Sequence, residues 1–517
     1  MQHLTRTILS SFIGFLLLTP LQAELWLPAI FSDNMVLQRE APVPIWGSTI
    51  AGYSVSVEID GQTKSTTANS EGKWRIDLDP IPAGGPYTLA IQANEIVKRF
   101  ENVLSGEVWI CSGQSNMALG AKRSYDWDLE RLVTHSPNIR ILTIGQQSAE
   151  RPLNDFKGEW KLSTDQSLED FSAVGYYFGR RLHQTLNVPI GLIDNSWGGS
   201  TVEAWLPRET LDADSMFSPL MNWWDRKMAA YSQEDYDADV AAAQTKIAAW
   251  EAGGRQGAKP RIPRDDRNGQ KRPANLYNAM VHPILGYGIR GMIWYQGEAN
   301  TKRAYQYREL FPLLIQTIRQ RWGLGDFPFY WVQLADYRDE KSVPVQSEWA
   351  ELREAQSLTL ERLDNVAQAI IIDAGEGRDI HPRDKHTVSE RLARIALARD
   401  YNYNLAYQSP QMQSVEFKDG QALITFEHVD GSLYTFDVKQ PLGFTIAGVN
   451  RKFVWAEAKQ IGSNKIQVWS DEVPNPVAVR YGWADNPIVN VYDRAGLPLT
   501  PFRSDDWPGI TAHTKTP

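Results

Sequence analysis

The sequence predicts an α/β fold, in which a parallel sheet with flanking helices lies between two β-sandwich-type regions. Short apolar runs alternate with helical stretches between about residues 104 and 404, the pattern of parallel strands joined by crossover helices. Short alternating runs separated by turn residues fill residues 24–103 and return from about residue 405. A chain of 517 residues is also too long for one hydrophobic core, so several domains are expected.

Residues 1–23 have the pattern of a secretory signal peptide. Arg6 is their only charged residue, Ile8–Leu18 is an apolar core, and Leu21–Ala23 offers a small-residue cleavage end. The apolar core is shorter than the roughly 20 residues that span a bilayer. We therefore expect an exported bacterial protein, periplasmic or secreted, with no membrane span in the mature chain.

Composition restricts the possible partners. The formal net charge of −9 gives no electrostatic basis for nucleic-acid binding. Cys111 is the single cysteine, which excludes an intrachain disulfide, and its place in an apolar strand predicts buried packing. Nineteen Trp and twenty Tyr fit large β cores or sugar-stacking surfaces.

Residues 24–103 are expected to form a small β sandwich. Alternating runs at Ser54–Asp60, Lys73–Leu78 and Tyr87–Gln92 are separated by turn residues, and Pro80–Pro86 interrupts the pattern. No helical periodicity is present in this region.

Residues 104–404 are expected to form the central α/β domain. The predicted strands are Val108–Cys111, Ile139–Ile144, Pro189–Asp194, Gly291–Tyr295, Phe329–Leu334 and Ala367–Asp373. The predicted helices are Val174–Leu186, Ala304–Trp322, Glu348–Leu363 and Val388–Ala398.

Residues 207–275 interrupt this alternation and are interpreted as an insertion. Tyr231–Trp250 is predicted to be helical, and the Gly-, Arg-, Pro- and Lys-rich stretch Glu251–Ala274 to be a loop. The insertion is either a lid over the site or a solvated surface excursion.

Residues 405–517 are expected to form a second β region, with a hairpin at Ser414–Phe426 and further strands at Lys465–Trp469 and Val477–Tyr481. This region could pack against the first β region.

A serine follows the first predicted strand of the central domain. Ser115 lies in the tight polar turn Gly113–Met117, where open α/β folds bring ligands to the carboxyl ends of strands. The turn is not a Gly-x-Ser-x-Gly elbow, because Met117 takes the place of the second glycine. An ordinary strand-to-helix turn capped by Ser115 is the alternative.

Residues at other predicted strand ends could supply the oxyanion donors and the general base that ester hydrolysis requires. Trp197–Ser200 contains glycines that can present a backbone N–H, and Gln296 carries a side-chain amide that can donate to an oxyanion. Glu298 could bind sugar hydroxyls or brace its loop. His381, in the polar loop after the last strand, is the side chain best suited to act as general base. His135, His282 and His386 are weaker rivals.

Four motifs occur in order between residues 113 and 382: Gly-Gln-Ser-Asn-Met, Trp-Gly-Gly-Ser, Trp-Tyr-Gln-Gly-Glu and Asp-Ile-His-Pro. Together they resemble the sialate O-acetylesterase family, a group of carbohydrate acetylesterases within the SGNH hydrolases. The central domain is therefore expected to be an SGNH-hydrolase-like parallel sheet.

The resemblance implies a serine esterase mechanism. Ser115 is then the nucleophile, His381 the base and acid, and Asp379 the orienter of His381. The oxyanion hole is expected from Gly199, Gln296 and the Ser115 N–H. We assign Asn116, Trp197 and Glu298 to substrate binding. No metal or organic cofactor is needed.

One departure concerns the acid. SGNH hydrolases have two residues between acid and base, whereas one residue separates Asp379 from His381. Glu376, Asp384 or a backbone carbonyl could hold the ring instead, and a Ser–His dyad is another arrangement.

The resemblance favours 9-O-acetyl sialic acid as substrate. Acetylated hemicellulose such as xylan or xyloglucan is one alternative, and a non-catalytic carbohydrate-binding protein is another. A sialate carboxylate invites an arginine, for which Arg123, Arg272 and Arg378 are candidates. The oligomeric state is not predicted.

Overall fold

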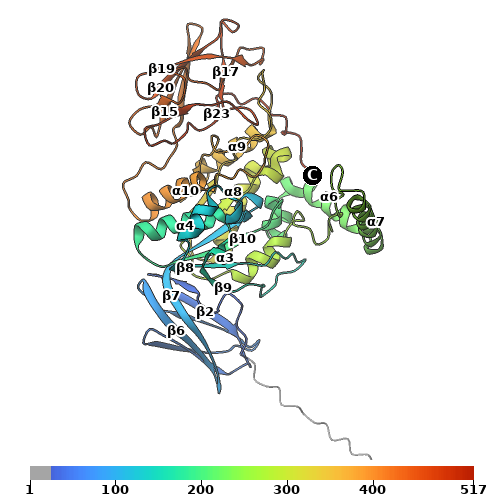
Figure 1. The fold of residues 1–517 in the computed structure, drawn as a ribbon, viewed down its shortest axis with the longest axis vertical. Coiled ribbons are helices and arrows are strands. Elements are labelled where there is room, and N and C mark those ends of the chain that lie inside the picture. The colour runs from blue at the N-terminus through green and yellow to red at the C-terminus, as the bar shows by residue number, and fades with distance from the viewer. Residues whose placement is uncertain (1–24) are drawn as a thin grey trace, which may run out of the picture.

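The computed structural model describes residues 25–517, so the expected signal peptide lies outside the described residues. Figure 1 shows an N-terminal β region, a central α/β domain and a C-terminal β region one after the other. The two β regions stand at opposite ends, because the central domain lies between them (Figure 1). They do not pack against each other, contrary to one arrangement that the sequence allows.

The central sheet confirms the α/β prediction. Its six parallel strands and one antiparallel edge strand follow the order β13-β12-β11-β7-β10-β8-β9. Their bounds are β13 Val366–Ala369, β12 Phe329–Val332, β11 Gly291–Tyr295, β7 Ile96–Gly113, β10 Ile190–Ser196, β8 Ser136–Thr143 and β9 Trp160–Ser163.

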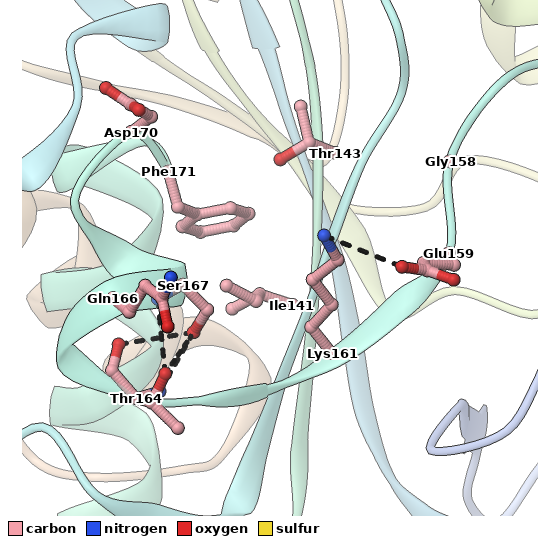
Figure 2. A pocket seen from close by; sticks show the side chains of 10 residues that line it. All are labelled: Ile141, Thr143, Gly158, Glu159, Lys161, Thr164, Gln166, Ser167, Asp170 and Phe171. Atoms are coloured by element: carbon pink, nitrogen blue, oxygen red, sulfur yellow. Dashed lines mark hydrogen bonds and ion pairs between the residues drawn. The ribbon is translucent and has the colours of Figure 1, made fainter.

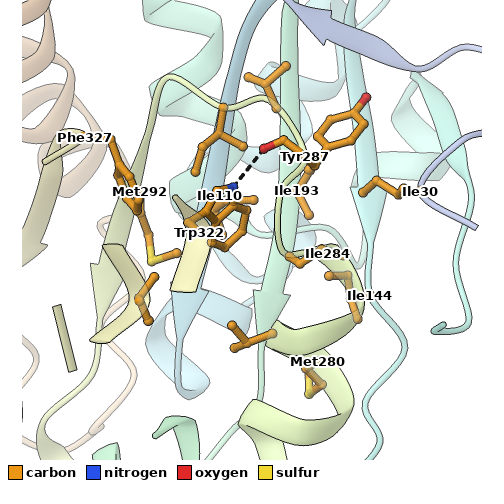
Figure 3. Packing of buried hydrophobic residues seen from close by; sticks show 14 of the residues in the cluster. Ile30, Ile110, Ile144, Ile193, Met280, Ile284, Tyr287, Met292, Trp322 and Phe327 are labelled. Atoms are coloured by element: carbon orange, nitrogen blue, oxygen red, sulfur yellow. Dashed lines mark hydrogen bonds between the residues drawn. The ribbon is translucent and has the colours of Figure 1, made fainter. Parts of the chain in front are cut away.

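Helices cover both faces of this sheet, which explains why its strands are continuous apolar runs. Val108 and Ile110 of β7 face the core shared with α8 (Ala304–Trp322) and α9 (Glu348–Leu358). Trp109 and Cys111 face the core shared with α4 (Ala173–Leu186) and α10 (Lys385–Asp400). Figure 3 shows part of the first core, including Ile110, Met292 and Trp322. The buried thiol of Cys111 confirms its packing role, and burial raises its pKa.

Strand β7 is much longer than the run Val108–Cys111 from which it is predicted. Its first half pairs antiparallel with β6 (Gly84–Ala93) in the N-terminal region, and its second half lies between β10 and β11. Lys98, Arg99 and Glu101 in the first half are exposed and interrupt its apolar residues. This half therefore lacks the continuous apolar run from which the second half is predicted. One strand thus joins two sheets.

The two β regions differ in their cores, because the buried residues of the N-terminal region are continuous with the core on one face of the central sheet. The N-terminal region adds β1 Val36–Gln38, β2 Val43–Ser48, β3 Ser54–Ile59, β4 Gln62–Thr67 and β5 Lys73–Leu78. β2 and β5 form a second sheet whose apolar residues share a core with β3 and β6. The C-terminal region has a separate core. Its longer strands are β14 Gln411–Lys418, β15 Gln421–Glu427, β17 Phe444–Ala447, β19 Glu457–Ile461, β20 Lys465–Trp469 and β21 Ala478–Tyr481, and its four two-residue strands are β16 Tyr434–Thr435, β18 Val454–Trp455, β22 Val491–Tyr492 and β23 Phe502–Arg503.

The insertion consists of helices followed by a loop. α6 (Ser218–Ala229) begins with a proline in its first turn, and the predicted helix is α7 (Gln233–Ala252). Ala243 is the one buried residue of α7, so its other side chains meet solvent. In the stretch 25–517, none of the helices is both long and apolar enough to cross a membrane.

Candidate active site

Ser115 is the first residue of the short helix α1 (Ser115–Ala118), directly after β7. The turn depends on Gly113, whose φ is +136° and whose position leaves no room for a side chain, since a Cβ there would lie 2.2 Å from the carbonyl oxygen of Tyr295. The adjacent Gln114 N–H donates to that same oxygen at 2.9 Å. These contacts fix the turn against β11 and leave Ser115 half-buried at the sheet edge.

The glycine turn after β10 lies against Ser115. The Trp197 N–H donates to the Gly113 carbonyl oxygen at 3.0 Å, and a Cβ on Gly198 would lie 3.3 Å from the Cβ of Ser115. Gly199 has φ +71°, a left-handed conformation that favours glycine. Its N–H has no backbone acceptor within residues 25–517. A backbone donor is therefore available beside the serine.

Three buried side chains connect the serine turn to the histidine loop; we call Asn116, Glu298 and Lys385 the brace. The Asn116 Nδ2 donates to Glu298 Oε1 at 2.6 Å and to the Ile380 carbonyl oxygen at 2.9 Å. The Lys385 Nζ donates to Asn116 Oδ1 at 2.7 Å. The residue after Ser115 is thus bonded to the residue before His381, which brings the two loops together.

Burial changes the proton affinities of the brace. It lowers the pKa of Lys385 to about 7, although the carboxylates of Glu298 and Asp384 act in the opposite direction. It raises the pKa of Glu298, and the hydrogen bond from Asn116 partly offsets that effect. The Nζ of Lys385 also lies 5.2 Å from the centre of the Tyr295 ring.

The brace occupies two side chains that the sequence assigns to substrate binding. Both N–H groups of Asn116 are engaged within the protein, and its side chain is buried. Glu298 Oε1 holds Asn116, which corresponds to the loop-bracing alternative for this residue. Trp197 remains half-buried on the glycine turn beside Ser115. Asn116 and Glu298 therefore link the Ser115 and His381 loops, and their assignment to substrate binding stays a prediction.

His381 lies in the loop between β13 and α10, with its side chain 28% exposed. Its backbone N–H donates to Asp379 Oδ1 at 2.9 Å, while Nδ1 lies 3.6 Å from the same oxygen. Among the described residues the ring makes no hydrogen bond with Ser115, a common state in hydrolase sites without substrate. The Asp–His contact is therefore looser than a triad hydrogen bond.

The other candidate acids are engaged elsewhere. Glu376 accepts from the backbone and guanidinium of Arg383, and Asp384 caps α10 by accepting from the Thr387 N–H at 3.0 Å. Asp379 is thus the carboxylate left beside the ring. Burial lowers the pKa of His381; Asp379 opposes this change, and Lys385 and Arg123 reinforce it.

Gln296 is fully buried and does not offer its amide to a ligand in this structure. Its Nε2 donates to the Ser200 carbonyl oxygen at 3.1 Å and to Asn300 Oδ1 at 2.8 Å, while the Tyr307 hydroxyl donates to Oε1 at 3.0 Å. With both N–H groups engaged, Gln296 holds the end of the Gly198–Ser200 turn. These contacts place Gln296 in support of the turn in this structure, and its assignment as an oxyanion donor stays a prediction.

The brace shows what sequence reasoning missed. Lys385 follows His381 by four residues, but nothing in the sequence indicates that its side chain is buried or that it contacts Asn116. Of the candidate arginines, Arg272 is paired with Glu150 at 2.6 Å, and Arg123 lies close enough to affect His381.

Two cavities differ in their relation to this site. One of about 830 Å³ lies between β8, β9 and α3 (Asp165–Leu168), and Figure 2 shows Thr164 and Ser167 bonded to each other there. None of the predicted site residues lines it. The other, of about 770 Å³, is lined by Glu298 and Ile380 and so opens beside the loop that carries His381.

Comparisons with known proteins show the family of the chain. A family model described as "Carbohydrate esterase, sialic acid-specific acetylesterase" matches residues 105–234 and 238–400. The match spans every loop that carries a predicted site residue.

Similar proteins extend the resemblance over most of the chain. Sialate O-acetylesterase of Homo sapiens is 28% identical over 91% of this chain and 91% of its own length. The Mus musculus enzyme of the same name is 31% identical over 77% of this chain and 78% of its own length. The crystal structure of a carbohydrate acetylesterase from Xanthomonas citri is 33% identical, with a TM-score of 0.79, covering 94% of this chain and all of that one.

Proposed function

The chain belongs to the sialic acid-specific acetylesterase family of carbohydrate esterases and is a carboxylic ester hydrolase, and from this premise we propose that Ser115 and His381 remove O-acetyl groups from sialic acid. The observation that carries the residue assignment is the brace. It ties the residue after Ser115 to the residue before His381 through one amide. A nucleophile and a base must be held at a fixed mutual position, which such a link supplies.

The proposed reaction has two steps. The Ser115 Oγ attacks the acetyl carbonyl carbon while His381 takes its proton, and His381 then protonates the departing sugar oxygen. Water, deprotonated by His381, attacks the acetyl-serine and releases acetate, which restores the Ser115 hydroxyl. The N–H groups of Ser115 and Gly199, which have no backbone acceptor among residues 25–517, would bind the oxyanion, with Gln296 supporting the turn. Asp379 would orient His381 and stabilise its charged form.

Sialic acid is the proposed sugar because the family model and the mammalian relatives carry that substrate in their descriptions. The bacterial relative is described only as a carbohydrate acetylesterase, so acetylated hemicellulose is the substrate to test beside it. The pattern in residues 6–23 supports an exported enzyme, which N-terminal sequencing of the mature protein would test.

The test is acetate release from an O-acetylated sialoside and from acetylated xylan, with the wild type and Ser115→Ala. We expect release from the sialoside alone and a loss of about 10⁴-fold or more in the variant. Labelling of Ser115 by an organophosphonate, located by mass spectrometry, provides a second readout.

The outcomes separate the parts of the proposal. Release from xylan alone would keep the mechanism and replace the substrate. Undiminished activity in a folded Ser115→Ala protein would remove Ser115 as nucleophile. No release and no labelling would favour a non-catalytic carbohydrate-binding protein.

A further inference from the structure

The insertion supplies one wall of the 770 Å³ cavity beside the catalytic loops. Glu298, Ala299 and Ile380 line it on the catalytic side. Trp223 of α6 and the loop residues Arg264 and Lys271 line it from the insertion. The cavity volume lies within the range of small-ligand sites and is large enough for a monosaccharide.

The cavity is lined by six basic and four acidic side chains, the acidic ones being Glu203, Asp266, Glu298 and Glu348. Its basic side chains are Lys227, Arg264, Lys271, Lys302, Arg303 and Arg338. Three of these have acidic partners: Lys227 pairs with Asp266, Arg303 with the buried Glu203, and Arg338 with Asp485 and Glu348. Arg264, Lys271 and Lys302 form no ion pair with any part of the chain that the structure describes.

Arg264 lies at the glycine turn that borders Ser115. A Cβ on Gly199 would be 3.8 Å from both terminal nitrogens of the Arg264 guanidinium, and a Cβ on Gly198 would be 3.3 Å from the Ser115 Cβ. These contacts connect the guanidinium to the nucleophile through Gly199 and Gly198. A sugar bound at Ser115 would therefore lie next to this part of the insertion loop.

Hydrogen bonds hold the insertion loop on that turn. The Gln270 Nε2 donates to the Gly198 carbonyl oxygen at 3.1 Å, and the Thr201 Oγ1 donates to the Lys271 carbonyl oxygen at 3.1 Å. Lys271 is exposed at the cavity but partly desolvated, which lowers the pKa of its ammonium; the charge of Arg264 adds to the effect and that of Glu203 opposes it. The loop thus keeps two like charges close together, and the one carboxylate that acts on Lys271, that of Glu203, is already paired with Arg303. An anionic ligand would stabilise such an arrangement.

We propose that Arg264 and Lys271 bind the carboxylate of an acidic sugar whose acetyl ester lies at Ser115. This proposal rests on the proposed function, because it assumes that the sugar is the substrate of Ser115. A guanidinium matches the two oxygens of a carboxylate, and an ammonium adds a third charge-assisted hydrogen bond. The pair would determine specificity, because a neutral acetylated sugar leaves both cations without a partner.

Binding tests this proposal without catalysis. Calorimetry on Ser115→Ala protein would compare N-acetylneuraminic acid with its methyl ester, which lacks the negative charge and is larger by one methyl group. We expect the acid to bind at least about tenfold more tightly. Adding Arg264→Ala and Lys271→Ala is expected to abolish that preference. Arg261→Ala is the matched control, because Arg261 is an exposed cation of the same loop outside the cavity, and the preference should survive there.

Equal binding of acid and ester by the parent, or a preference kept in the double variant, would overturn the proposal. The single variants Arg264→Gln and Lys271→Gln, each expected to lose part of the preference, replace the double variant if it does not fold.

Hydrolysis separates this proposal from the proposed function. Wild type that releases acetate equally from O-acetylated sialic acid and its methyl ester would overturn the carboxylate site while keeping the esterase assignment. Wild type that releases none, while Ser115→Ala protein still prefers the acid, would overturn the sialate esterase function while supporting the carboxylate site.

Discussion

The loops at the edge of the central sheet and the insertion differ in how they are held. The brace is buried, and each of its members has a hydrogen-bond partner within 2.9 Å. In the insertion, by contrast, α7 has one buried residue, and Arg264 and Lys271 are exposed at the cavity. The proposed catalytic residues therefore lie on the Ser115 and His381 loops, which buried hydrogen bonds hold and which we call the scaffold. The proposed sugar-binding residues lie on the insertion loop. Substitutions in the scaffold should change kcat, and those in the insertion should change KM.

The largest expected effect comes from removing His381, the proposed general base. His381→Ala should lower kcat by about 10⁴-fold or more, because neither proton transfer remains assisted. His386→Ala is the matched control, since its ring is stacked 3.8 Å from the Tyr177 ring and belongs to no part of the proposed site. Acetate release from O-acetylated sialoside measures both. A larger loss in the control would make the rival histidine the base.

The pH dependence of activity tests the proposed role of His381 as a base. His381 acts as a base when neutral, so activity rises with pH through its pKa. Because burial lowers that pKa, the acid limb of kcat/KM should lie below the usual value of about 6.5.

Asp379→Asn and Lys385→Met should move that limb in opposite directions. Removing Asp379 takes away the charge that stabilises the imidazolium, so the pKa falls and the limb moves to lower pH. Removing Lys385 takes away a repulsive charge, so the limb moves to higher pH, with Arg123 still opposing protonation.

These two variants should also lower kcat. We expect a loss of about 10- to 100-fold for Asp379→Asn, below the 10⁴-fold of a tight triad, because Nδ1 is 3.6 Å from the carboxylate. Lys385→Met should cost about tenfold in kcat and about 1–3 kcal/mol of stability, since Asn116 Oδ1 loses its donor. Shifts in the same direction would contradict the electrostatic account.

The smallest expected effect comes from removing an aromatic side chain of the insertion. Trp223→Ala should raise KM for the sugar by about 3- to 10-fold with little change in kcat, because an aromatic face is lost from the cavity wall. Trp250→Ala is the control, since its ring belongs to α7 and lies outside the cavity. Initial rates over a range of substrate concentration separate the two constants. A decrease in kcat with an unchanged KM would instead indicate that Trp223 affects the chemical step and not sugar binding.

Sequence reasoning succeeded where the pattern itself is local. The strand Gly291–Tyr295 and the helix Ala304–Trp322 have their predicted bounds, because both combine strong apolar periodicity with clear ends. β13 is shorter than predicted, since the apolar residues at 370–372 are buried outside the ladder. The four polar blocks were also found at strand ends, because parallel strands bring them to one edge.

The sequence by itself determined the α/β class, the family and the order of the polar blocks, because periodicity and short motifs are properties of neighbouring residues. The tertiary structure alone decided the tasks of particular side chains. Asn116 and Glu298 face each other across 182 positions, and Lys385 reaches Asn116 across 269. A hydrogen bond is satisfied by whichever group the fold brings within about 3 Å, so the role of a buried polar side chain depends on partners that its own sequence neighbourhood does not contain.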